Sequence, residues 1–135
     1  MAYIGQMSSI VTGVDFVSIP TQDVERAAAF YRDVLGLPNS VHRPERNFSE
    51  FENGTVTFSV IDPVRMGIGE FDRNANPIAL QVDDVAATRA TLEERGVEFA
   101  GDTFDSGVCH MAFFSDPEGN ALMLHHRYAP RQTEG

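Results

Sequence analysis

Two histidines in the C-terminal half of the chain are the residues whose types and spacing could support chemistry. His110 and His125 lie on neighbouring predicted strands, and Glu50 or Glu52 could approach them from the N-terminal half. Two imidazoles and a carboxylate can bind a divalent metal ion, whereas a histidine alone can transfer a proton near neutral pH. We therefore treat His110 and His125 as candidate catalytic residues. The simpler interpretation is that both are ordinary polar side chains, hydrogen-bonded on a strand or at its end.

Other reactive patterns in the sequence are weaker. Cys109 directly precedes His110, and neighbours along a strand point to opposite faces, so adjacency does not make them a nucleophile and its base. We expect Cys109 to be a buried thiol. Arg46, together with Arg43, could contact an anionic group near the mouth of a cavity. The sequence has no glycine-rich phosphate motif and no G-x-S-x-G motif, which argues against nucleotide binding and serine hydrolysis.

An internal repeat must position these residues. Asp23 and Asp84, 61 residues apart, each follow a short alternating strand and precede a helical pattern. An aspartate at that point can accept the free backbone N–H groups of the first helical turn, so both residues are predicted helix N-caps. Gly36 and Gly96 supply the left-handed residue that commonly ends a helix. Each half of the chain therefore begins with a strand and a helix.

Extended segments follow each predicted helix. The predicted strands are 37–41, 48–52 and 55–61 in the first half, and 97–100, 108–114 and 121–126 in the second. Asn53-Gly54 and the Asp116-Pro117-Glu118-Gly119 segment are typical of turns between strands. The chain is thus predicted to be α+β, with the order βαβββ twice. Module one covers about 12–62, a linker 62–76 and module two about 77–127, within a single domain of 1–135.

Composition excludes several partners. The 135 residues include 20 acidic and 10 basic side chains, and the net charge of −10 is opposite in sign to what nucleic acid or an anionic membrane surface requires. Cys109 is the only cysteine, so no intrachain disulfide can form and a reducing, cytoplasmic location is expected. The apolar runs are too short to cross a bilayer, and the first residues show no signal-peptide pattern.

Three stretches, VERAAAFYRDVLGLP, QVDDVAATRATLEERGVEF and FFSDPEGNALML, together with the repeat, resemble the vicinal oxygen chelate superfamily. That superfamily holds glyoxalase I, extradiol dioxygenases, fosfomycin-modifying enzymes and bleomycin-binding resistance proteins. The resemblance covers about residues 12–126. It implies that the two modules curl into an open, U-shaped barrel of mixed β-sheet, with the helices on the outside and a ligand cavity on the concave side.

Metalloenzymes of this superfamily hold a divalent ion in the cavity, and the resemblance implies where its ligands would fall. The first-strand histidines fall on Phe16 and Pro77, and the last-strand carboxylate falls on Met123. None of these side chains suits Zn²⁺ or Mn²⁺. On strand 55–61 the alternation turns Thr57 and Ser59 toward the cavity, again without a carboxylate. We therefore expect no catalytic metal and no other cofactor.

Phenylalanine and methionine in place of charged ligands would give a partly apolar cavity. We expect a metal-independent protein that binds a small, planar or aromatic organic molecule through Phe16, Thr57, Ser59, His110, Met123, His125 and Arg46. One alternative is a glyoxalase- or dioxygenase-type lyase, isomerase or oxygenase that uses a relocated metal or histidine acid/base catalysis. Another is an interaction module whose own side chains fill the cavity. Free sheet edges in the half-barrel predict a homodimer.

Overall fold

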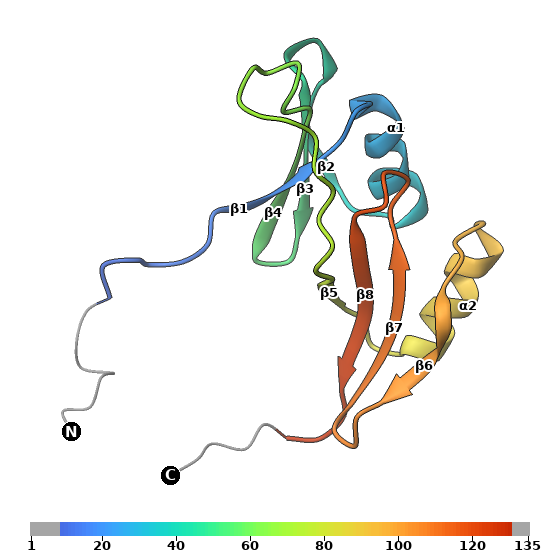
Figure 1. Ribbon diagram of the computed structural model, residues 1–135. Coiled ribbons are helices and arrows are strands. Elements are labelled where there is room, and N and C mark those ends of the chain that lie inside the picture. The colour runs from blue at the N-terminus through green and yellow to red at the C-terminus, as the bar shows by residue number, and fades with distance from the viewer. Residues whose placement is uncertain (1–8, 131–135) are drawn as a thin grey trace.

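Alternating apolar residues form two four-stranded sheets in the computed structural model, which describes residues 9–130. Module one contains β1 (Phe16–Pro20), β2 (Asn39–Arg43), β3 (Phe48–Asn53) and β4 (Val56–Ile61), in the order β1-β4-β3-β2. Module two contains β5 (Ile78–Gln81), β6 (Ala100–Asp105), β7 (Cys109–Ser115) and β8 (Ala121–Arg127), in the order β5-β8-β7-β6. In each sheet the first strand is parallel to the last and the other pairs are antiparallel. The predicted α+β class and repeated βαβββ order are confirmed (Figure 1).

The helices begin where the sequence predicts. Asp23 accepts a hydrogen bond from the backbone of Arg26 at 3.1 Å and begins α1 (Val24–Ala29). Asp84 accepts one from Ala87 at 2.9 Å and begins α2 (Val85–Glu94). A π-helical turn, η2 (Phe30–Val34), extends α1, and a 3-10 turn, η3 (Pro44–Arg46), links β2 to β3. Within residues 9–130, no helix has the length and apolar character needed to cross a membrane.

One predicted strand is displaced. A strand is predicted at 97–100. The observed strand, β6, begins at the last of these residues and covers Ala100–Asp105. Phe99 packs against Phe114, with ring centroids 5.1 Å apart, and lies under the guanidinium of Arg89 at 4.8 Å. Every residue of β6 is exposed, so this edge strand lacks the alternation of buried and exposed side chains on which the prediction depended.

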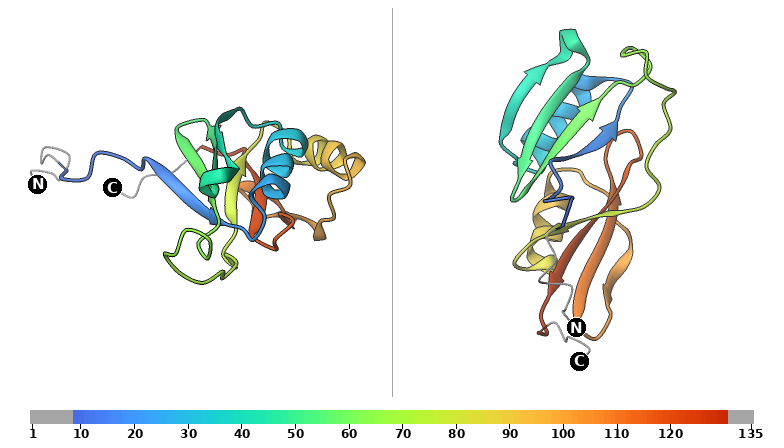
Figure 2. Two further views of the ribbon diagram at one scale, coloured as in Figure 1. Left: turned by 90° about the horizontal axis from the view of Figure 1, so that it is seen from above. Right: turned by 90° about the vertical axis from the view of Figure 1, so that its left-hand side faces the viewer.

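Both helices lie on the same side of the two sheets, and the opposite faces remain uncovered (Figures 1 and 2). We call these uncovered surfaces open face one, on module one, and open face two, on module two. The helix-covered faces form the core, which includes Ile19, Phe51, Phe58 and Val60 of module one and Leu80, Ala112, Phe114, Leu122 and Leu124 of module two. The two sheets are separate and do not join into a closed barrel among the described residues. This is an open arrangement.

The turn between β7 and β8 connects the modules through buried polar groups. Tyr31 is fully buried on η2 and donates its hydroxyl hydrogen to Asp116 at 2.6 Å. The same carboxylate accepts hydrogen bonds from the backbone of Glu118 and from the backbone and side chain of Asn120. Asn120 also donates to the carbonyl of Pro20, at the end of β1, at 2.8 Å. Burial and the adjacent Asp116 raise the pKa of Tyr31, which keeps its hydroxyl protonated as a donor.

Candidate functional site

Open face one carries polar side chains around one exposed aromatic ring. Strand register places Phe16, Thr57 and Glu52 in one row across β1, β4 and β3. The adjacent row contains Ser59, between Ser18 and Glu50. Thr57 and Ser59 therefore point to this face as predicted, although Ser59 is only 6% exposed and offers a ligand little surface. Phe16 is 57% exposed, which makes its ring the most accessible apolar surface of these two rows.

Open face two is apolar at its centre. Its first row contains Phe104, Met111, His125 and Gln81, from β6, β7, β8 and β5 in that order. The second row contains Ala100, Phe113, Met123 and Ala79 from the same strands. Met111, Phe113, Met123 and His125 are all partly exposed. The predicted ligand residues Met123 and His125 thus share a face with an aromatic ring and a second thioether, which sequence reasoning did not place there.

The positions at which the resemblance implies a divalent metal do not fit one. Phe16 and Met123 lie on the open faces, and Pro77 directly precedes β5. A phenyl ring and a proline ring cannot coordinate the ion, and a thioether does not suit Zn²⁺ or Mn²⁺. In the part of the chain between 9 and 130, no three His, Cys, Asp or Glu side chains are grouped to hold a metal ion.

His110 lies on the face opposite to the one predicted. It pairs across the strands with His126, whereas His125 pairs with Met111, so His110 and His125 point to different sides of the sheet. His110 contacts Asp105 at 3.5 Å, and its ring centroid is 4.8 Å from that of Tyr128. Tyr128 in turn donates a hydrogen bond to Asp105 at 2.8 Å. His110 is therefore part of a half-exposed surface cluster and does not belong with Met123 and His125.

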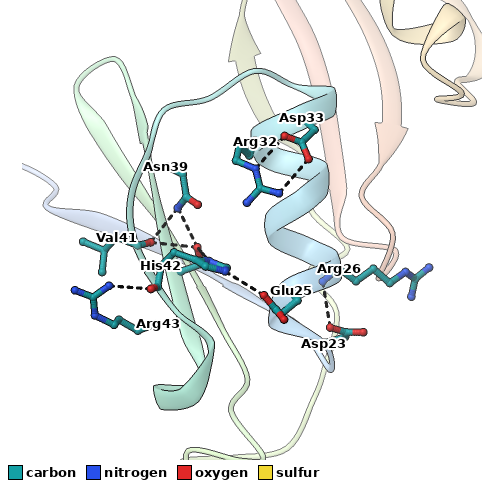
Figure 3. A network of polar contacts seen from close by, with 10 residues as sticks. Asp23, Glu25, Arg26, Arg32, Asp33, Asn39, Val41, His42 and Arg43 are labelled. Atoms are coloured by element: carbon teal, nitrogen blue, oxygen red, sulfur yellow. Dashed lines mark hydrogen bonds and ion pairs between the residues drawn. The ribbon is translucent and has the colours of Figure 1, made fainter.

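A serine, a histidine and a glutamate that the sequence analysis did not connect lie together in module one. The histidine and the glutamate, His42 and Glu25, are labelled in Figure 3. Nδ1 of His42 is 2.9 Å from the hydroxyl of Ser49, and its Nε2 is 3.2 Å from a carboxylate oxygen of Glu25. The order of residue types is that of a hydrolase triad, but the two ring nitrogens are exchanged, because a triad serine contacts Nε2 and its carboxylate contacts Nδ1. However, Ser49 is fully buried and its hydroxyl also bonds the carbonyl of Val41 and the amide of Asn39. No substrate could reach it, so the network fastens α1 to β2 and β3.

The remaining predicted contact lies in a turn of module one, and a large cavity lies between η2 and module two. Arg46 is exposed in η3, the turn between β2 and β3. A cavity of about 660 Å³ lies where Phe30 and Val34 of η2 approach module two, at Arg95, Val97, Phe114 and Leu122. Phe114 and Leu122 belong to the helix-covered core face. Ala100 and Phe113, from the row of Met123, also line this cavity, whereas Met123 and His125 do not.

Comparisons with known proteins agree with this architecture. The chain is similar to TnmS3, an antibiotic-binding protein from Streptomyces sp. CB03234, with 25% identity and a TM-score of 0.73 over 89% of this chain and 99% of that one. A superfamily member from Sphaerobacter thermophilus matches with 24% identity and a TM-score of 0.74 over 87% and 98% of the two chains. The uncharacterized protein YraH of Bacillus subtilis is 26% identical over 120 residues, which cover 81% of this chain and 94% of YraH.

A family model provides the assignment. The model described as Glyoxalase/Bleomycin resistance protein/Dioxygenase superfamily matches residues 13–124, a span that includes all eight strands except the end of β8. The chain therefore belongs to the glyoxalase/bleomycin resistance protein/dioxygenase superfamily.

Proposed function

We propose that this protein binds a planar or aromatic small organic molecule on its open faces, without a metal ion. The observation that carries the proposal is that Phe16 and Met123, at positions where the resemblance implies metal ligands, lie on the open faces, with Met111 and Phe113 beside Met123 on open face two. Apolar area covered by a ligand contributes roughly 25 cal/mol per Å², and thioethers pack well against aromatic rings. The antibiotic-binding neighbour TnmS3 supports the same class of function.

The polar residues of the proposed site fix the orientation of the ligand. His125 lies in the row next to Met123, and Thr57 lies beside Phe16. A catalytic alternative would need a histidine on an open face together with a partner group. His110, the histidine of module two that contacts a carboxylate, lies on the other side of the sheet, so no specific observation favours that alternative.

A fluorescence titration with the neutral planar compound acridine tests the proposal. Met123→Ala removes part of the apolar wall and is expected to weaken binding about fivefold, which corresponds to about 1 kcal/mol. Met66→Ala is the matched control, because Met66 is 39% exposed in the linker between the modules. Equal affinity of all three proteins for acridine, or no binding by the wild type, would contradict the proposed site.

We propose further that the protein is a homodimer. The free edges of the two open sheets, among them β6, in which every residue is exposed, favour association with a second copy. Sedimentation velocity at micromolar concentration is expected to give a species of twice the chain mass. A single monomeric species over the same concentration range is the result that would exclude this assembly.

The buried free thiol of Cys109 supports a reducing, cytoplasmic location.

A further inference from the structure

Two glutamates of β3 belong to the same rows as the proposed ligand residues. Glu52 pairs with Thr57 and Glu50 pairs with Ser59, so both carboxylates point to open face one. The hydroxyl of Thr57 donates to Glu52 at 2.8 Å, and Ser40 donates to its other oxygen. These hydrogen bonds, first that from Ser40 and then that from Thr57, hold the pKa of Glu52 below its ordinary value. Its carboxylate is therefore ionised at neutral pH.

The charges of Glu50 and Glu52 are not neutralised within the described chain. The ion pairs found among residues 9–130 involve neither glutamate. The neighbouring strand β2 carries one positively charged side chain, Arg43. It lies two residues after Val41, the residue that pairs with Glu50. Its guanidinium donates to the carbonyl of His42 at 2.9 Å. Arg46 is exposed in the turn outside these rows.

An exposed aromatic ring shares the row of one of these carboxylates. Phe16 and Glu52 flank Thr57 from its two sides, on β1 and β3. The face of an aromatic ring attracts a cation, and a carboxylate accepts hydrogen bonds from ammonium or amidinium N–H groups. Open face one therefore combines two independent features that favour a positive charge, beside the partly exposed hydroxyl of Thr57.

We infer that Glu50 and Glu52 make the site select a planar organic cation, such as a ring system that bears amino groups, over a neutral ring of the same size. This inference rests on the proposed function, in which the exposed ring of Phe16 supplies apolar surface for the rings in the row of Glu52. The carboxylates determine which rings are preferred. The overall charge of −10 acts in the same direction, by raising the local concentration of cations around the protein.

The test compares two dyes with the same three-ring skeleton. Proflavine carries two amino groups and is a cation at slightly alkaline pH, whereas acridine is neutral there. We expect wild-type protein to bind proflavine about tenfold more tightly than acridine. The double variant Glu50→Gln, Glu52→Gln should lose this preference and keep its affinity for acridine. The control variant Glu94→Gln, Glu98→Gln has the same net charge, with both changes at exposed positions in and after α2, and should keep the preference.

The outcomes separate this inference from the proposed function. Selection by Glu50 and Glu52 is wrong if the wild type binds acridine and proflavine equally. It is also wrong if the control variant loses the preference for proflavine as fully as the double variant does. In both cases small-molecule binding stands. If the wild type binds neither dye, the proposed function fails and this inference fails with it. Retained acridine binding by the double variant also shows that its fold is intact, so a lost preference reports the missing charges.

Discussion

Replacing Asp116 with alanine is expected to lower the free energy of unfolding by about 3–5 kcal/mol. The carboxylate is 6% exposed and accepts hydrogen bonds from the hydroxyl of Tyr31, from the backbone of Glu118, and from Asn120. Alanine would leave several buried donors without an acceptor, and each costs about 1–3 kcal/mol when it loses its partner. Urea unfolding monitored by circular dichroism measures the change.

Two variants make this prediction specific. Asp33 forms an exposed ion pair with Arg32 at 2.9 Å, so Asp33→Ala is expected to leave the stability nearly unchanged. Tyr31→Phe removes one donor to Asp116 and keeps the ring, so an intermediate loss of about 1–2 kcal/mol is expected. A loss for Asp116→Ala no larger than that for Asp33→Ala would show that the turn does not hold the modules together.

Adjacent residues of β8 are expected to differ in how strongly their truncation destabilises the protein. Leu122 is 1% exposed in the core, and Leu122→Ala should cost about 2–5 kcal/mol of stability. Met123 points to open face two and is partly exposed, so Met123→Ala should cost about 1 kcal/mol or less while it weakens acridine binding. The same unfolding experiment compares the two. If Met123→Ala destabilises as much as Leu122→Ala, Met123 fills the interior and the binding site is misplaced.

The sequence predicts elements whose signals are local. Asp23 and Asp84 act on the three residues that follow them. The turn between β3 and β4 is at Gly54-Thr55, one residue after the start of the predicted Asn53-Gly54 signal. These features need no knowledge of distant contacts. The Asp116 turn itself was also predictable, but its contact with Tyr31 joins residues 85 positions apart and depends on how the modules pack.

The candidate site was harder to predict, because some strands give no clear alternation. Between Met111 and Phe114 both faces of β7 carry apolar residues, so the pattern does not show on which face His110 lies. In β3 the run from Phe48 to Asn53 mixes apolar and polar residues on both faces, which concealed the direction of Glu50 and Glu52. On β4, where Phe58 and Val60 alternate with polar residues, the predicted direction of Thr57 and Ser59 agrees with the register.

Metal-independent binding on the open faces is tested most directly by a nuclear magnetic resonance titration of acridine in the presence of excess chelator. The expected result is a set of amide shift changes concentrated at Met111, Met123 and His125, with further changes at Phe16 and Thr57, at unchanged affinity with and without chelator. Shift changes confined to the cavity between η2 and module two, at residues such as Val34, Arg95 and Val97, would contradict the proposed site. Binding that disappears with chelator and returns with a divalent metal would contradict metal independence.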